Sequence, residues 1–174
     1  MVEEGLQGVR FFEFLTEEER AEFAEASEMV AFEPGETIIE EGGGTHDLFV
    51  LTSGKVEVRK RIPGDGERLL AEIDAANEPT VVGERRLLGE SGASATVRAT
   101  ERVEAIKLPR QTFRRMVSEG RPAAFKLSYR IARTLAQRLT RLDEEVVEAI
   151  RELESRGETD LEAFRDKLIT DWAV

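Results

Sequence analysis

The segment from Gly83 to Leu88 combines backbone and side-chain chemistry that binds anions. A glycine followed by a glutamate and two arginines can begin a short helix, and the amides at the start of such a turn attract negative charge. Arg85 or Arg86 could add a guanidinium, which pairs with a phosphate through parallel hydrogen bonds, if its side chain turned inward. Either arginine can equally point to solvent. These residues favour a site for a small anion, and they do not indicate which arginine supplies its positive charge.

Few residues in the chain are suited to catalysis or to metal binding. Among 174 residues there is no cysteine and a single histidine, His46. A histidine-cluster metal site and a cysteine nucleophile are therefore excluded, and a Ser-His-Asp relay is disfavoured. Neither a Gly-x-x-x-x-Gly-Lys-Ser/Thr loop nor a Gly-x-Gly-x-x-Gly fingerprint is present. We predict a non-catalytic protein with no metal and no cofactor.

The elements that must hold the anion-binding segment are mostly short and extended. Thr16 and Glu19 predict a capping box before a helix over residues 17–26. Beyond it, apolar and β-branched stretches are separated by glycine and proline turns, which predicts a sandwich, barrel or jelly roll. After Pro109 the pattern becomes helical, with helices near 110–118 and 123–155. The predicted strands are 28–33, 36–41, 47–52, 55–61, 68–73, 79–82, 94–99 and 102–108.

Several of these stretches resemble, in order, the signatures of the cyclic nucleotide-binding domain family. They are Phe32–Ile39, Leu48–Val56, the phosphate-binding cassette within residues 82–99, and Leu108-Pro109-Arg110 followed by Phe113. The resemblance implies a mainly β fold with flanking helices, a double-stranded β-helix or jelly roll (a β-roll), followed by a long C-terminal helix. We expect residues 1–120 to form the β-roll with N-terminal helices, 121–156 the long helix, and 157–174 an acidic helical tail.

The cassette departs from the family pattern at one position. Gly83 and Glu84 match its opening and Ser94-Ala95-Thr96-Val97 its close, but Ala93 stands where the family has an arginine. The resemblance implies that Glu84 accepts hydrogen bonds from a ribose hydroxyl and that Ser94 donates to a phosphate oxygen. Losing one partner of a buried charge pair costs about 2–5 kcal/mol, so we expect cyclic nucleotide binding to be weak, altered or lost. The candidate pocket comprises Gly83, Glu84, Arg85, Arg86, Leu87, Ala93, Ser94 and Ala95.

The long helix predicts an interface. Its apolar positions recur at intervals of three or four residues and form a stripe that a domain of this size cannot cover. In the resembled family the equivalent helix pairs with its symmetry mate, so we expect a homodimer with coiled-coil character through Leu135–Leu153. Alternatively, the tail folds back over the stripe with Leu161, Phe164, Leu168, Ile169 and Trp172. The stripe is Ile131, Leu135, Leu139, Leu142, Val146, Ile150 and Leu153.

Charge and length restrict the partners. A net charge of −11 disfavours attraction to nucleic acid or to anionic membranes. The residues after Gly157 are acidic and too few for a helix-turn-helix module, so DNA binding is the least expected function. With no apolar run of membrane length and an acidic N-terminus, we expect a cytoplasmic location. The expected function is a regulatory or sensor module of the cyclic nucleotide-binding type; the alternative is a scaffolding protein that binds a protein partner through the β-roll and long helix.

Overall fold

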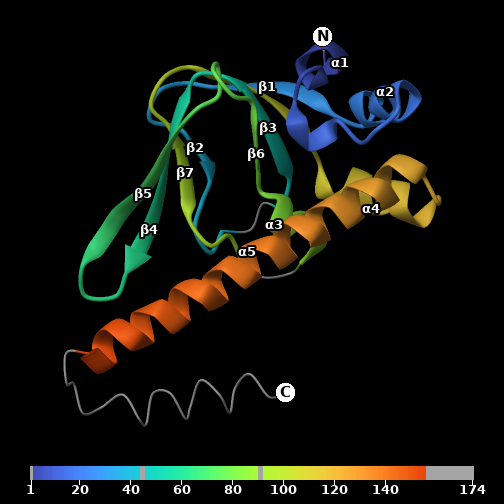
Figure 1. Cartoon of the computed structure of the whole chain (residues 1–174). Helices are drawn as coiled ribbons and strands as arrows, with labels where there is room; N and C mark the ends of the chain where they lie inside the picture. Colours follow the sequence, from blue (N-terminus) through green and yellow to red (C-terminus); the bar gives the residue numbers. More distant parts are fainter. Residues whose placement is uncertain (1, 44–45, 90–91, 156–174) are drawn as a thin grey trace. The chain divides into compact units, whose positions relative to one another are not determined.

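Two antiparallel sheets form a β-roll in the computed structural model, which describes residues 2–43, 46–89 and 92–155 (Figure 1). The first sheet has the order β1-β8-β3-β6 and the second the order β2-β7-β4-β5. Every predicted strand is confirmed, with its ends shifted by at most two residues. The strands are β1 (Glu28–Phe32), β2 (Thr37–Ile39), β3 (Leu48–Ser53), β4 (Lys55–Ile62), β5 (Gly66–Asp74), β6 (Thr80–Val82), β7 (Thr96–Ala99) and β8 (Val103–Leu108).

The core lies between the two sheets because alternate residues of their strands point inward. In β8, for example, Val103 and Ala105 are completely buried whereas Glu104 between them is exposed. Each sheet contributes apolar side chains to one continuous cluster. The chief members of that cluster are Ile38, Ile39, Phe49, Leu51, Val56, Val82, Val97, Ala99, Val103 and Ala105.

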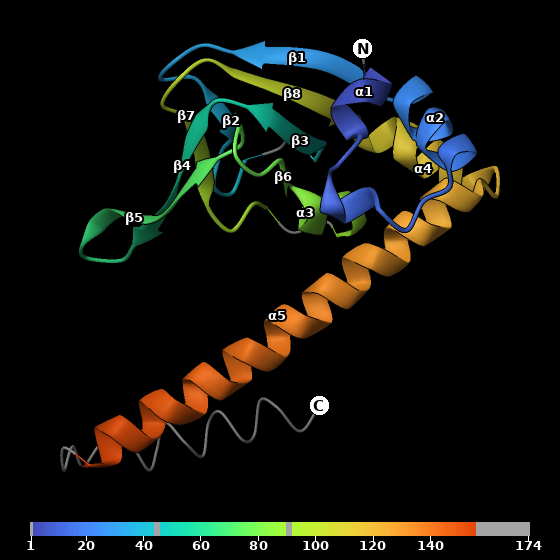
Figure 2. The same cartoon turned by 45° about the horizontal axis from the view of Figure 1, so that its top comes forward.

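Three helices, α1 (Val2–Leu6), α2 (Glu17–Glu25) and α4 (Arg110–Ser118), lie near one end of the β-roll (Figure 2). The capping box predicted for α2 is confirmed, since the Thr16 hydroxyl accepts from the Glu19 amide and the Glu19 carboxylate accepts from the Thr16 amide. Glu19 and Glu22 of α2 also form ion pairs with Lys126 and Arg121, which tie it to the C-terminal helical segment. The elements are α1 (Val2–Leu6), a 3-10 turn η1 (Arg10–Phe12), α2 (Glu17–Glu25), α4 (Arg110–Ser118) and α5 (Pro122–Ser155).

The helix α5 passes through both compact units of the chain, residues 1–131 and residues 132–174. Its first turns belong to the first unit, where Leu127 and Ile131 are buried. Ile131 is therefore a core residue, which corrects its inclusion in the predicted dimer stripe. The acidic tail at 157–174, the fold-back contacts expected of it and the side chain of Leu153 lie outside the residues whose structure is described.

Candidate functional site

The anion-binding segment folds as predicted into a short helix, α3 (Glu84–Leu88), directly after β6. Gly83 caps it with φ of +86°, a left-handed conformation that glycine adopts without strain. A Cβ at Gly83 would lie 2.6 Å from the Asp47 carbonyl oxygen. The turn and the close approach both require glycine, and together they press α3 against the residues that precede β3.

Residues 92–97, which we call the closing arm of the site, lie beside residues 41–43. Ala93 forms an isolated parallel bridge with Glu41, and the Gly42 amide donates to the Ala93 carbonyl at 3.0 Å. The Glu41 amide donates in turn to the Thr96 hydroxyl at 3.1 Å. We refer to residues 83–89 and 92–97 as the cassette, and to residues 41–43 and 46–47 as the facing loop. The two are joined along both arms of the cassette.

The predicted pocket residues include buried, half-buried and exposed members. Glu84, Arg86, Leu87 and Ala93 are buried, with Glu84 6% and Arg86 2% exposed. Both Glu84 and Arg86 are ionisable, and charged side chains are seldom fully buried unless they are paired. The exposed members are Arg85 and Ser94, while Gly83 and Ala95 are half-buried.

Arg86 has the inward orientation that the sequence left open between two neighbouring arginines. Its guanidinium donates to the Gly43 carbonyl of the facing loop. Its Nε atom is buried and has no hydrogen-bond partner within the described part of the chain. Burial lowers the pKa of this guanidinium from its ordinary value, and the charge of nearby Asp47 opposes that shift. One well-buried positive charge therefore belongs to the cassette.

Arg85, the preceding residue of α3, faces solvent instead. It is exposed, and its guanidinium reaches the Gly92 carbonyl only at 3.4 Å, which is long for a hydrogen bond. The two arginines are adjacent in sequence, yet only one of them carries its charge into the protein.

The sequence did not predict that Asp47, Lys107 and Arg110 would lie around the cassette. Asp47 accepts from the Arg110 amide at 3.0 Å and lies 3.5 Å from the Lys107 ammonium. The Arg110 guanidinium donates to the Gly89 carbonyl at 3.1 Å. Arg110 belongs to one of the family-like signatures, but neither signature nor spacing indicated a contact with the cassette. These contacts join residues far apart in sequence, so no local pattern predicts them.

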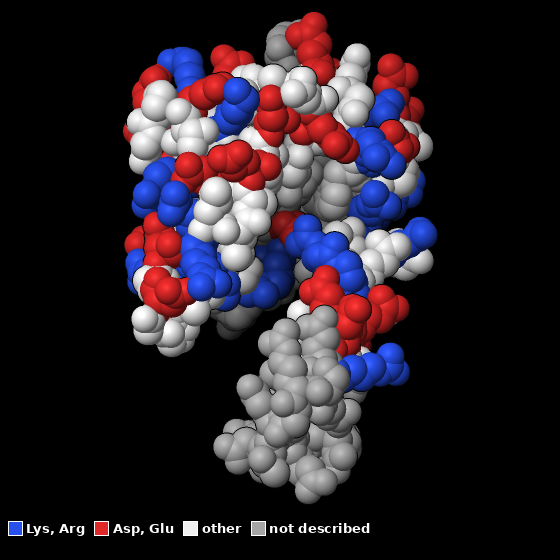
Figure 3. Space-filling view, turned by 60° about the vertical axis from the view of Figure 1, so that its left-hand side comes forward, with Lys and Arg blue, Asp and Glu red and all other residues white. Residues whose placement is uncertain are grey.

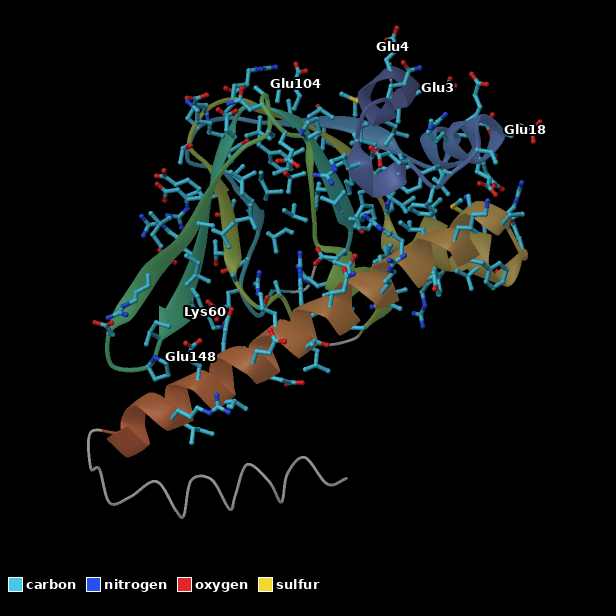
Figure 4. The ribbon with its side chains drawn as sticks, viewed as in Figure 1. Glu3, Glu4, Glu18, Lys60, Glu104 and Glu148 are labelled. Atoms are coloured by element: carbon cyan, nitrogen blue, oxygen red, sulfur yellow. The ribbon has the colours of Figure 1, made fainter. Side chains whose placement is uncertain are left out.

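Lys60 of β4, labelled in Figure 4, supports the closing arm. Its ammonium donates to the Ser94 carbonyl at 2.7 Å and lies 3.5 Å from the Glu41 carboxylate. The Arg61 amide also donates to Glu41, and this hydrogen bond, together with the charge of Lys60, lowers the pKa of that carboxyl. The closing arm and the facing loop are thus held by the same strand.

The charged surface shows no large area of one sign on the face drawn in Figure 3, where acidic and basic side chains are interspersed. Within the described ranges, no three histidine, cysteine, aspartate or glutamate side chains are arranged to hold a metal ion. None of the helices in those ranges combines the length and apolar character that a membrane crossing requires.

Residues 132–155 of α5 carry the predicted dimer stripe. Leu139 is 59% and Leu142 54% exposed, whereas Leu135, Val146 and Ile150 are half-buried. Such exposure of leucine on one helix face leaves apolar surface in contact with water.

Comparison with known proteins identifies the family of the β-roll. The model of the family described as "Cyclic nucleotide-binding domain" matches residues 29–119. A cGMP-dependent protein kinase of Toxoplasma gondii is 32% identical over 70% of this chain and 11% of its own length. A cAMP-dependent protein kinase regulatory subunit of Colletotrichum orbiculare is 31% identical over 67% of this chain and 28% of its own. The chain thus spans 11–28% of these curated relatives.

Solved structures agree with this assignment. A cyclic nucleotide-binding domain from Methylobacillus flagellatus has a TM-score of 0.69 at 19% identity, covering 85% of this chain and 82% of that one. A regulatory subunit of a cAMP-independent protein kinase A from Trypanosoma cruzi, bound to guanosine, has a TM-score of 0.59 at 30% identity, covering 70% and 41%. Because the family model spans more than half of the 174 residues and the β-roll is the fold of these structures, the protein belongs to the cyclic nucleotide-binding domain family.

Proposed function

We propose that the protein is a non-catalytic regulatory module whose cassette binds a cyclic nucleotide weakly or binds an altered ligand of the nucleotide class, and which acts as a homodimer through α5. The relatives named above are a cyclic nucleotide-dependent kinase and a regulatory subunit of such a kinase. In proteins of this kind the β-roll supplies regulation rather than chemistry, and the aligned part contains no catalytic domain.

The observation that carries the ligand proposal is the contrast between Glu84 and Ala93. Glu84 is buried at the start of α3, in the position that the family uses for a ribose hydroxyl. Ala93 occupies the family arginine position, where its methyl group offers no charge to a phosphate. A cassette with these two residues keeps the sugar end of the ligand site and changes the phosphate end.

The change at the phosphate end brings nucleosides into consideration as ligands. The guanosine-bound regulatory subunit from Trypanosoma cruzi is a relative whose ligand has no phosphate. Since Ala93 weakens the case for a phosphate more than the case for a ribose, both nucleosides and cyclic nucleotides belong in a binding test.

Isothermal titration of the full chain tests this function directly. We expect heats of binding with cAMP, cGMP, a cyclic dinucleotide, adenosine or guanosine, at dissociation constants weaker than micromolar for the cyclic nucleotides. Micromolar or tighter binding of cAMP or cGMP would contradict a weakened cassette. Silence with every compound up to millimolar concentration would contradict ligand binding and favour the second candidate function.

That second candidate is protein-protein scaffolding. The exposed leucines Leu139 and Leu142 favour it, since apolar surface on a helix binds another protein surface irrespective of what the cassette binds. We place the homodimer first because a stripe with helical spacing is complementary to a second copy of itself. A partner of different sequence would leave the protein monomeric in isolation, which light scattering detects.

A further inference from the structure

Arg86 is a buried charge with little compensation among its described neighbours. Only 2% of the residue is exposed, and its hydrogen-bonding acceptor is a neutral carbonyl, that of Gly43. Guanidinium has several N–H donors in a fixed plane, and the buried Nε has no acceptor within the described ranges. A buried charge is retained at a large desolvation cost unless a partner offsets it.

Asp47 is the acidic group that acts on Arg86, but its carboxylate is already engaged. One oxygen accepts from the Arg110 amide at 3.0 Å, and the other lies 3.5 Å from the Lys107 ammonium. Lys107 is itself paired with Glu28 at 3.1 Å. Asp47 therefore attracts Arg86 without forming a hydrogen-bonded ion pair with it in the described contacts.

The guanidinium of Arg86 lies near Ala93, the position at which the family has its arginine. Arg86 donates to the carbonyl of Gly43, and the neighbouring Gly42 amide donates to the carbonyl of Ala93. The head of Arg86 and the backbone of Ala93 thus contact adjacent residues of one loop. Gly92 lies against the same loop, since a Cβ there would be 2.8 Å from the Gly42 Cα.

We propose that Arg86 supplies the positive charge that the cassette lacks at Ala93, and that the phosphate of a cyclic nucleotide is the anion it pairs with. The inference rests on the proposed function. It names Arg86 as the residue that determines whether the site prefers a ligand with a phosphate over one without. The Nε of Arg86 has no acceptor among the described residues, and a guanidinium beside the cassette can form the bidentate pair that phosphate favours. The Gly43 hydrogen bond holds the side chain in place for that contact.

The competing explanation is that Arg86 only braces the facing loop through Gly43. The two roles differ in their dependence on ligand charge. If Arg86 only holds the facing loop in place, its substitution should weaken the binding of cAMP and adenosine alike, because both ligands depend on the position of that loop. If Arg86 pairs with the phosphate, its substitution should weaken the binding of cAMP alone, because adenosine has the base and sugar without the phosphate. Arg85 provides a matched control, since it is the adjacent arginine on the same helix and is exposed.

Isothermal titration of the full chain with cAMP and with adenosine separates these roles, using the wild type, Arg86→Gln, Arg86→Lys and Arg85→Gln. We expect Arg86→Gln to weaken cAMP binding by at least about thirtyfold. We expect its affinity for adenosine to change by less than about threefold and Arg86→Lys to retain part of the cAMP affinity. Arg85→Gln should weaken cAMP binding far less than Arg86→Gln does, because the Arg85 side chain is exposed. Thermal unfolding of each variant shows whether it is folded.

Three results would overturn the role of Arg86 alone, and a fourth would overturn it together with the proposed function. The first is wild-type-like binding of cAMP by Arg86→Gln, and the second is an equal loss for cAMP and adenosine; both leave the proposed function standing. The third is a wild type that binds adenosine as tightly as cAMP, which would show that the site takes a nucleoside without using its charge. A wild type that binds none of the nucleotides and nucleosides would contradict the ligand-binding function itself, and with it the Arg86 proposal.

Discussion

The guanidinium of Arg86 donates to the carbonyl of Gly43, which lies 43 residues earlier in the chain. This contact joins α3 to the loop that also holds Ala93, so the cassette contains a buried cation although its family position for one is filled by alanine. The consequences for binding, stability and assembly can each be measured.

Moving the cation tests whether positions 86 and 93 serve one subsite. Ala93→Arg in the Arg86→Gln background is expected to raise cAMP affinity by about thirtyfold or more. In the wild-type background the gain is expected to be smaller, because two neighbouring guanidinium groups repel each other. Titration of the four proteins of this double-mutant cycle measures the coupling. Equal gains in both backgrounds would contradict a shared subsite.

Glu84 is expected to bind the sugar of the ligand, as the family resemblance implies. Hydrogen bonds to charged groups contribute about 1.5–3 kcal/mol, so Glu84→Gln should weaken cAMP binding about tenfold to a hundredfold. The same substitution should have little effect on 2′-deoxy-cAMP, which lacks the hydroxyl. If both nucleotides lose affinity equally in competition titrations, Glu84 acts on the fold of the cassette and not on the ribose.

Gly83 is expected to be required for stability as well as for the shape of the site. Gly83→Ala combines left-handed strain at φ +86° with a methyl group 2.6 Å from the Asp47 carbonyl oxygen. Gly64 is the matched control, since its φ is +82° and no heavy atom of its described surroundings lies within 4 Å of a built Cβ. Urea unfolding should show a loss of about 1–2 kcal/mol for Gly64→Ala and a larger loss for Gly83→Ala. Equal losses would show that the loop moves aside without cost.

The capping box of α2 makes part of the stability depend on pH. Hydrogen bonds from Lys126 and from the Thr16 amide lower the pKa of Glu19 below its ordinary value of 4.5. A lowered pKa stabilises the folded protein at pH values above 4.5, and this contribution is lost as the pH falls through the folded-state value. The wild type should therefore exceed Glu19→Gln by about 1 kcal/mol at pH 7, and the difference should shrink below pH 4.5.

Glu18, labelled in Figure 4, is the control for that measurement because it is an exposed residue of the same helical turn. Denaturant unfolding of Glu18→Gln from pH 3 to pH 7 should follow the wild type closely. A gap between wild type and Glu19→Gln that stays constant over this range would show that the contribution of Glu19 is not electrostatic.

Assembly through α5 is tested by a charge placed on its stripe. Leu139→Glu is expected to yield a monomer at concentrations where the wild type is a dimer, because the interface would bury an unpaired carboxylate. Gln137→Glu adds the same charge about half a turn away, on the opposite face of the helix, and should remain dimeric. Light scattering coupled to size exclusion measures the mass of each. A monomeric wild type would contradict the dimer.

Much of the fold could be predicted because its signals are local. The capping box at Thr16 and Glu19 and the left-handed turns at Gly35 and Gly54 each depend on a few neighbouring residues. Local signals also explain why the prediction that Ile131 belongs to the dimer stripe was wrong. Its spacing fits the stripe of α5, but the buried end of that helix was not visible in the periodicity.

At the site, the amino-acid order alone indicates a glycine-led helix that carries Glu84 and two arginines, with alanine at position 93. Which of the two arginines turns inward depends on the tertiary fold. Adjacent residues on a helix point about 100° apart, so either could have been buried. The choice of Arg86 depends on Gly43 and Asp47, whose contact with α3 is set by how the loop before β3 packs against it.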